Sequence, residues 1–405
     1  MKINFENISK ASLLLNGKVK KTPTIEALSL GKHLGCNLFL KLENLQITSS
    51  FKVRGAFIAI NNLTKENKSK GVIAMSAGNH AQAVAYHAKN LGINSTIIMP
   101  EQAPFSKVTR TRELGAEVIL RGRTLNESAQ FVSKLCKEKG YSLIHPYDDP
   151  NTVIGQGTIG IEILNDFSNL DFLIIPIGGG GLASGIAIAV KHLNPKIKII
   201  EVESKLFPSN FNLFNSLNEP FGGETLADGI AVKFPGEITS PIIQKYIDQI
   251  LLVDEFSIEN SISALFEHER IVSEGAGAAG IAAIIQNMNL FHNKNIGSVI
   301  CGGNIDSRIF AGILNRKLAR DGRIQKIRID ITDEPGMLAK ISNCIAQNGG
   351  NIIEIYHQRM FHDVPMKEAK IDAIIEALSI NHINKIISSL IALGFKVRTI
   401  SDSSY

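Results

Sequence analysis

Long apolar runs are missing from this sequence of 405 residues. Its apolar stretches have the length of a strand or are interrupted by glycine, whereas a transmembrane helix needs about 20 consecutive apolar residues. The first ten residues, MKINFENISK, are polar and lack the apolar core of a secretory signal. We therefore expect a cytoplasmic protein that does not interact with membranes.

Cysteine and clustered charge are also scarce. The four cysteines, at positions 36, 136, 301 and 344, lie far apart without a CxxC pair, which leaves no zinc pattern and no evident disulfide framework. The net charge is +5, but the basic residues are scattered among acidic ones and form no dense stripe of the kind that binds nucleic acid. A reducing cytoplasm fits these absences, and we expect no nucleic-acid partner.

Short apolar runs alternate with helical stretches as far as about residue 318. Val72–Met75 and Ser95–Met99 are predicted strands, and between them a helix is predicted over Asn79–Leu91, with Gly92 as its stop. The same theme returns at Val118–Leu120, Phe172–Ile177, Lys198–Val202 and Ser298–Cys301. Strands that alternate with helices predict an α/β fold with a largely parallel sheet covered on both faces.

A different order of elements begins near Lys326. We predict a strand, a turn and a helix, then two strands, a helix and a last strand, at Lys326–Thr332, Asp333–Gly336, Met337–Gln347, Asn351–Met360, Ala369–Ala377, Ile383–Leu393 and Lys396–Ile400. This βαββαβ order is a ferredoxin-like split unit. The charged segment Asn315–Arg323 is interpreted as a linker. The predicted domains are 1–318 and 326–405, joined by residues 319–325.

Lys52 is the first candidate for chemistry. It lies between Phe51 and a small, apolar helix start in the segment SSFKVRGA, Ser49–Ala56. Most lysines are solvated surface charges, but a desolvated lysine has a lowered pKa and can form a Schiff base with an aldehyde. The local context alone leaves both interpretations open.

Two turns could bind anions. The segment SAGNHAQ, Ser76–Gln82, follows a predicted strand and opens a helix, whose N-terminal N–H groups can bind a carboxylate. An ordinary loop with Asn79 near the helix cap is the alternative. The second turn, Gly178–Gly181 followed by Leu182, comes directly after another strand. Four adjacent glycines are entropically costly, which indicates close approach to the backbone, and a phosphate is the natural ligand.

Other interpretations of two of these features stay open. The glycine run lacks the ending of a P-loop, but it matches a loose G-x-G-x-x-A dinucleotide pattern with Glu201 or Glu203 near the acidic position. Four glycines match many patterns, so this match is weak. Cys301, at the end of a strand, is of a type that is usually a small buried hydrophobe, and a functional role would require a ring nitrogen beside its thiol.

Taken together, the motifs resemble those of fold-type II pyridoxal 5'-phosphate (PLP) enzymes, and most closely those of threonine dehydratases. The resemblance covers nearly the whole chain and includes, in order, SSFKVRGA, SAGNHAQ, GQGTIGIEI (Gly155–Ile163), GGGGL (Gly178–Leu182), TLADGIAV (Thr225–Val232) and CGGNID (Cys301–Asp306). It implies two parallel-sheet α/β subdomains, with a smaller one of about residues 53–148 inserted in the larger.

The resemblance also implies roles at matching positions. Lys52 would hold PLP as a Schiff base and later move protons, while Phe51 would pack against the pyridine ring. Asn79 would bind the ring's 3-oxygen, and Cys301 would face the ring nitrogen. The phosphate would lie in the glycine turn, formed by Gly178, Gly179, Gly180, Gly181 and Leu182. The substrate carboxylate would be held by Ser76, Ala77, Gly78, Asn79 and His80.

The chemistry implied for this family uses PLP as an electron sink. Lys52 would remove the Cα proton of L-threonine, the β-hydroxyl would leave as water, and hydrolysis would give 2-oxobutanoate and ammonia. L-Serine would give pyruvate. A serine dehydratase or serine racemase is the nearest alternative, but racemases carry a serine base where this chain has Ala77. Their metal site is incomplete here, because Ser209 stands where a carboxylate would accompany Glu203, so we predict no metal.

The tail, Ile329–Arg359, resembles an ACT domain through IDITDEPGMLAKISNCIAQNGGNI. In that family, pairs of domains bind an amino acid, and the matching contacts are Asp333, Gly336, Met337 and Asn351. The alternative is that the glycines only form turns and the domain only dimerises. We expect allosteric regulation, with isoleucine as the default effector and valine, serine or threonine still open. The family implies a homodimer or homotetramer.

Two more distant functions fit the sequence less well. A dinucleotide-binding oxidoreductase would leave Lys52 and the segment Ser76–His80 unexplained. A non-enzymatic amino-acid sensor on an inactive PLP fold is disfavoured by the intact lysine and glycine run. The sequence does not separate a role in isoleucine biosynthesis from one in threonine catabolism.

Overall fold

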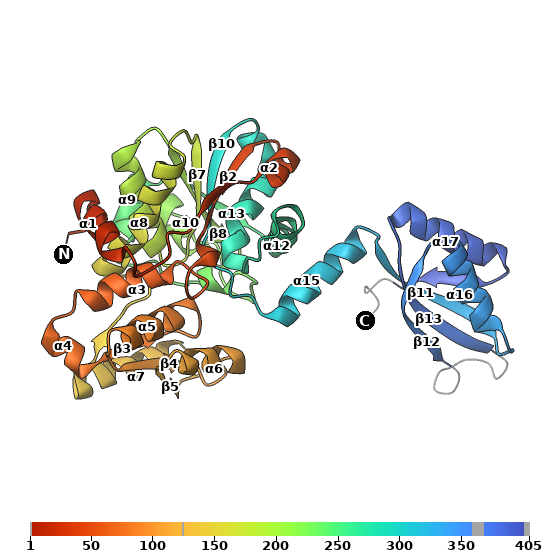
Figure 1. The fold of residues 1–405 in the computed structure, drawn as a ribbon, viewed down its shortest axis with the longest axis horizontal. Coiled ribbons are helices and arrows are strands. Elements are labelled where there is room, and N and C mark those ends of the chain that lie inside the picture. The colour runs from red at the N-terminus through yellow and green to blue at the C-terminus, as the bar shows by residue number, and fades with distance from the viewer. Residues whose placement is uncertain (1, 124, 359–367, 401–405) are drawn as a thin grey trace. The chain divides into compact units, whose positions relative to one another are not determined.

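The computed structural model describes residues 2–123, 125–358 and 368–400 (Figure 1). The chain forms two compact units, Met1–Ile305 and Asp306–Tyr405, which we call the N-terminal unit and the C-terminal unit. Within the described residues, no helix has both the length and the apolar character needed to cross a membrane.

The large sheet of the N-terminal unit has six strands in the order β1-β2-β10-β7-β8-β9. Its neighbours are parallel except for β1 and β2, which pair antiparallel. The strands are β1 (Thr24–Glu26), β2 (Asn37–Leu42), β7 (Phe172–Pro176), β8 (Lys198–Ser204), β9 (Gln249–Val253) and β10 (Asn295–Ile300). Every residue of β7 is buried, as expected for a parallel strand that is covered on both faces.

Helices cover both faces of this sheet (Figure 1). On one side lie α1 (Phe5–Leu15), α8 (Pro150–Asp166) and α9 (Gly181–Leu193), which pack on one another. On the other side lie α12 (Glu255–Glu269) and α13 (Gly275–Gln286). Shorter elements complete this part: α2 (Leu28–Leu34), η1 (Glu43–Leu45), α10 (Ser209–Asn215), η2 (Asp228–Ile230), α11 (Ser240–Tyr246) and α14 (Met288–Phe291).

The small sheet of the same unit has the order β5-β4-β3-β6 and is parallel throughout. Its strands are β3 (Val72–Met75), β4 (Ser95–Met99), β5 (Glu117–Leu120) and β6 (Ser142–Leu143). The helices α3 (Lys52–Asn61), α4 (Lys65–Lys70), α5 (Asn79–Asn90), α6 (Phe105–Glu113) and α7 (Leu125–Lys139) accompany them. The two parallel sheets confirm the predicted fold class, and the small sheet lies inside the segment predicted as an inserted subdomain.

The C-terminal unit carries an antiparallel sheet in the order β12-β13-β11-β14. Its elements are α15 (Ser307–Arg320), β11 (Ile324–Thr332), α16 (Met337–Gln347), β12 (Asn351–Gln358), β13 (Glu368–Glu376), α17 (Ile380–Ala392) and β14 (Lys396–Thr399). Isoleucines of α16, α17, β11 and β13 form one core. The βαββαβ order is therefore confirmed, while residues 359 and 360 of the predicted strand Asn351–Met360 lie outside the described residues.

The segment predicted as a linker is largely ordered secondary structure. Residues 319 and 320 end α15, residues 321–323 form a turn, and Ile324 begins β11. The charges that suggested irregular chain belong to the surface of a helix, where Lys317 pairs with Asp321 and Ile313 is buried. The two units divide after Ile305, earlier than the predicted boundary at residue 318.

Candidate active site

Lys52 is placed by contacts between its own segment and the end of β10. Ser50 forms a β-bridge with Gly302, and the Phe51 N–H donates to the carbonyl oxygen of Cys301 at 3.1 Å. The helix α3 then begins at Lys52 itself. Lys52 is thereby held at the carboxyl end of the large, mainly parallel sheet, the edge at which α/β proteins bind ligands.

Lys52 is partly buried. Its Nζ donates to the carbonyl oxygen of Pro146 at 2.8 Å and lies 4.9 Å from the centroid of the Phe51 ring. Burial lowers the pKa of Lys52 to about 8, although Cys301 and Glu274 oppose this change. With this pKa, roughly a tenth of the amine is neutral at pH 7 and half of it at pH 8. The neutral amine is the state that attacks an aldehyde.

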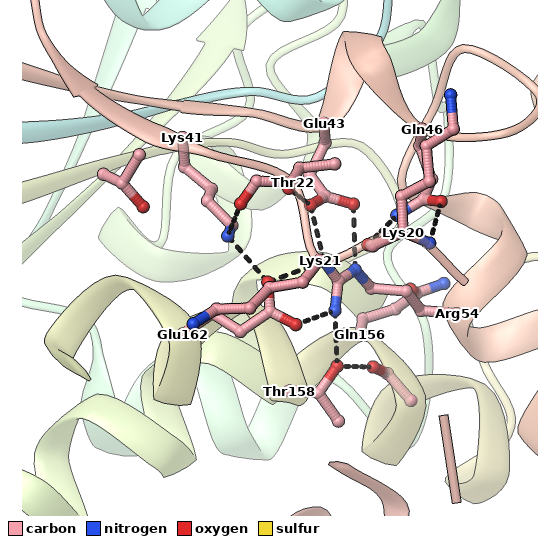
Figure 2. Close-up of polar contacts among 12 residues, drawn as sticks. Lys20, Lys21, Thr22, Lys41, Glu43, Gln46, Arg54, Gln156, Thr158 and Glu162 are labelled. Atoms are coloured by element: carbon pink, nitrogen blue, oxygen red, sulfur yellow. Dashed lines mark hydrogen bonds and ion pairs between the residues drawn. The ribbon is translucent and has the colours of Figure 1, made fainter. Parts of the chain in front are cut away.

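A network of buried charges holds the first turn of α3 (Figure 2). The guanidinium of Arg54 donates to both carboxylate oxygens of Glu43, at 2.9 and 2.7 Å, and to Glu162 at 2.6 and 2.9 Å. Lys41 completes the network with a contact of 2.6 Å to Glu162. Two cations thus face two carboxylates, and their charges balance. The network joins α3, two residues after Lys52, to β2, η1 and α8.

Asn79 lies at the start of α5 with both ends of its amide engaged. Its Nδ2 donates to Glu274 Oε1 at 2.7 Å, and its Oδ1 accepts from Asn304 Nδ2 at 2.6 Å. This fixes the orientation of the amide and leaves one Nδ2 proton for a ligand. Burial raises the pKa of Glu274 to about 7, with a further rise from Asp228, while the bond from Asn79 lowers it.

The turn before α5 offers main-chain donors. Within the described residues, the N–H groups of Asn79, His80 and Ala81 have no acceptor, as is usual for the first turn of a helix. Ser76 Oγ accepts from the Gly78 N–H at 3.1 Å and shapes the turn. Ala77 is partly buried between them.

The His80 ring faces the protein interior. Its Nε2 lies 2.7 Å from the carbonyl oxygen of Ile144 and must therefore carry the proton. Burial, followed by the charge of Lys52, lowers the pKa of His80 to about 3. The ring is thus neutral, and only the main chain of His80 is suited to an anion.

The glycine run connects β7 to α9. The N–H groups of Gly178, Gly179, Gly180, Gly181 and Leu182 have no acceptor in the described part of the chain. Gly180 has φ +90°, and a Cβ there would lie 2.6 Å from Thr239 Oγ1. A Cβ on Gly179 would lie 2.3 Å from the ring of Tyr147. These positions require glycine because neighbouring side chains touch the backbone, and the free N–H groups suit a phosphate.

Cys301 follows β10 and is buried. Burial raises the pKa of its thiol well above the usual value, and the carboxylate of Glu274 raises it further. The thiol is therefore neutral, and it can donate only a weak hydrogen bond. The four cysteines are all unpaired thiols.

The predicted site residues of the N-terminal unit thus lie at the ends of β10, β7 and β3. Several residues that contact them were not predicted from the sequence. Glu274 lies between small residues in SEGAGAAG, and Asn304 and Arg54 lie inside quoted motifs without an assigned role. Tyr147 carried no signal in the sequence.

No metal centre is evident within the described residues, where no three His, Cys, Asp or Glu side chains are placed to share an ion. Ser209, at the position where racemases would carry a metal-binding carboxylate, donates from its hydroxyl to Glu203 at 3.1 Å.

The fold and the site define a class of protein: a two-sheet α/β enzyme with a desolvated lysine and two turns whose N–H groups are free. The chain belongs to the family of pyridoxal-phosphate dependent enzymes, whose family model matches residues 15–302. The cofactor is PLP, and the residues present fit it: an amine for the aldehyde, free N–H groups for the phosphate and a neutral thiol. When bound, PLP withdraws electrons from the bonds at the Cα atom of an amino acid.

The chain is also similar to individual proteins over most of its length. It is 40% identical over 400 residues to an L-threonine ammonia-lyase of Thermotoga maritima, which covers 98% of this chain and 100% of that protein. Its structure resembles maize serine racemase (TM-score 0.73, 32% identity, 79% of this chain and 99% of that one). It also resembles processed threonine deaminase isoform 2 of Solanum lycopersicum (TM-score 0.72, 34% identity, 77% and 87%).

The candidate effector residues of the C-terminal unit are not brought together within one chain. Asp333, Gly336 and Met337 follow the end of β11, whereas Asn351 begins β12. Asn351 pairs with Glu376, which pairs in turn with Ile324 at the start of β11. The two levels are separated by the length of β11, whose nine residues span eight steps or roughly 27 Å.

Proposed function

We propose that the protein is a threonine ammonia-lyase that converts L-threonine to 2-oxobutanoate and ammonia, with a side activity on L-serine. The observation that carries this proposal is the placement of the desolvated Lys52 amine between two turns with free N–H groups. The similarity to an L-threonine ammonia-lyase over the full length supports the choice of substrate.

Each part of the site has a role in this proposal. Lys52 binds the cofactor and then takes the proton from the Cα atom of the substrate. Phe51 packs against the cofactor ring, Asn79 binds its 3-oxygen and the neutral Cys301 thiol faces its nitrogen. The free N–H groups of Gly178–Leu182 bind the phosphate, and the turn Ser76–His80 binds the substrate carboxylate.

Serine racemase is the second candidate, because a solved serine racemase has a similar fold. Racemisation needs a second group that returns a proton to the opposite face of the Cα atom. The methyl side chain of Ala77 cannot transfer a proton, so elimination of the β-hydroxyl is the favoured reaction.

We infer further that the C-terminal unit is an ACT domain that binds an amino acid, with isoleucine as the first effector to test. A site that uses both Gly336 and Asn351 needs two C-terminal units, because one unit holds them at opposite ends of its sheet. This supports a homodimer or homotetramer. The free thiols fit a protein of the reducing cytoplasm.

The experiment is an assay of 2-oxobutanoate from L-threonine and of pyruvate from L-serine, with and without isoleucine, beside the visible spectrum of the protein. We expect a cofactor band, faster turnover of threonine than of serine and a change with isoleucine. A cofactor band without threonine turnover would show that the enzyme acts on another substrate. An unchanged rate with every tested amino acid would refute the effector assignment.

A further inference from the structure

Two carbonyl groups of the glycine run are each held by a buried side chain. The carbonyl oxygen of Gly178 accepts from Asn210 Nδ2 at 2.6 Å, and that of Gly179 accepts from Thr239 Oγ1 at 2.8 Å. Asn210 and Thr239 are 1% and 0% exposed, so water does not compete for these bonds. The two donors come from α10 and from the residue before α11.

Holding a carbonyl also sets the direction of the next N–H group. A peptide unit is planar and trans, so its C=O and N–H bonds point in opposite directions. The bond from Asn210 therefore directs the Gly179 N–H away from α10, and the bond from Thr239 directs the Gly180 N–H away from α11. Neither N–H group has an acceptor within the described residues.

Asn210 is itself held in one orientation by Glu203. Oε1 of Glu203 accepts from Asn210 Nδ2 at 2.9 Å and from the Asn210 N–H at 3.0 Å, and Oε2 accepts from the Phe211 N–H at 2.9 Å. A flipped amide would place its oxygen against both the Glu203 carboxylate and the Gly178 carbonyl. The donor side of Asn210 must therefore face the glycine run.

From this geometry we propose that Asn210 and Thr239 are positioning residues that fix two peptide units of the glycine run, so that the Gly179 and Gly180 N–H groups are set toward the phosphate of PLP. This inference rests on the proposed place of the phosphate. A run of four glycines is flexible by itself. In this proposal, two side chains outside the glycine motif restrict that flexibility and preorganise the run for binding.

The test compares PLP with pyridoxal, which lacks the phosphate, on the full-length protein freed of cofactor. Thr239→Val removes the hydroxyl and keeps the shape. We expect a three- to tenfold rise, roughly, in the Kd for PLP, from the loss of one hydrogen bond, and an unchanged Kd for pyridoxal. Thr239→Ser keeps the hydroxyl and should bind PLP like the wild type.

A matched control is available in α6. Thr111 is 1% exposed, and its hydroxyl donates to the carbonyl oxygen of Lys107 at 2.9 Å, so Thr111→Val removes an equivalent buried bond. This variant should change neither Kd. Asn210→Ala, the second test, should raise the Kd for PLP at least as much as Thr239→Val, again without effect on pyridoxal.

Gly180→Ala tests the phosphate site at the glycine run separately from the positioning roles of Asn210 and Thr239. A Cβ at this position disrupts the run directly, so it should weaken PLP binding more than Thr239→Val does. If Gly180→Ala alone weakens PLP binding, the run binds phosphate and the positioning roles are wrong. If even Gly180→Ala has no effect, the phosphate lies elsewhere and both ideas fail. Equal losses for PLP and pyridoxal in Thr239→Val and Asn210→Ala would show a general structural role and overturn the proposal.

Discussion

Gly180 in the N-terminal unit and Gly336 in the C-terminal unit have almost the same backbone conformation. Gly180 has φ 90° and ψ −9° before α9, and Gly336 has φ 89° and ψ −8° before α16. Their surroundings differ. A Cβ on Gly180 would collide with Thr239, whereas no described residue has an atom within 4 Å of a Cβ on Gly336. The same turn is thus enclosed by its own chain in one unit and left open in the other.

This difference separates a preorganised site from an accessible one. In the N-terminal unit, buried side chains surround the turn and fix its peptide groups before any ligand arrives. In the C-terminal unit, the open turn leaves its surroundings to be supplied by whatever binds there. The first arrangement suits the cofactor, and the second is compatible with the effector site that we propose.

The largest effect should come from the centre of the enclosed site. Lys52→Ala removes the amine that we propose binds the cofactor and moves the Cα proton. We expect a loss of turnover of at least roughly 10²–10⁴-fold with L-threonine, because the general base is gone. Steady-state assay measures the loss, and circular dichroism checks that the fold is kept. Residual activity near the wild-type level would exclude Lys52 as the base.

The two units also differ in how deeply they bury an arginine–carboxylate pair. Arg54 and Glu43 are both 0% exposed, whereas the Arg328 side chain, which bonds Asp372 at 2.6 Å through two nitrogens, is 30% exposed. Arg54→Met leaves two carboxylates with a single lysine and should lower the free energy of unfolding by about 3–5 kcal/mol. Arg328→Met should cost less, about 1–3 kcal/mol. Denaturant unfolding measures both, and equal losses would contradict the comparison.

The two glycines themselves allow a matched pair of substitutions. Gly336→Ala should cost only the strain of a left-handed alanine, about 1–2 kcal/mol of stability, because there is room for the methyl group. Gly180→Ala adds a collision to the same strain and should weaken PLP binding more than tenfold, roughly, which is about 1.4 kcal/mol or more of binding free energy. Thermal unfolding and equilibrium dialysis give the two values. A loss of stability for Gly336→Ala that exceeds the loss for Gly180→Ala would contradict the comparison.

The smallest effect concerns pH. Because the pKa of Lys52 is about 8 in the fold, the neutral amine increases about fivefold from pH 7 to pH 8 and less than twofold beyond. The rate at which the cofactor-free protein takes up PLP should follow this curve in stopped-flow absorbance. A rate that continues to rise steeply to pH 10 would show that the amine is not desolvated.

The same lowered pKa predicts how stability changes. An unfolded lysine titrates near its ordinary value of 10.5, so between pH 8 and 10.5 the unfolded chain holds more protons than the folded one. The contribution of Lys52 should therefore make the cofactor-free protein more stable as pH rises through this window, and add no further change below pH 8. Lys52→Met removes the titrating amine and serves as the control.

Periodic features of the sequence were predicted well, because they depend on local rules. Val72–Met75, Ser95–Met99 and Met337–Gln347 have the predicted bounds, since each combines a clear apolar pattern with a turn residue at its end. The charged segment near residue 319 was misjudged, because a helix surface and an irregular linker have similar composition.

The partners within the site could not be predicted in the same way. Asn79 and Glu274 lie 195 residues apart, and Tyr147 meets Gly179 only through the packing of the two sheets. Composition and periodicity say nothing about such pairs. The motifs indicated candidate ligand-binding groups, but not the residues that hold those groups in place.

The position of β10 between β2 and β7 has a consequence for synthesis of the chain. β2 ends at residue 42 and β10 begins at residue 295, so a ribosome adds 253 residues before the parallel partner of β2 exists. At about 5–20 residues per second, this wait is on the order of tens of seconds. The small sheet, complete by residue 143, can close far earlier. The nascent protein must therefore keep the apolar edge of β2 from aggregating for most of its translation. Lys52, which is placed by contacts with the end of β10, reaches its final position only when that interval ends.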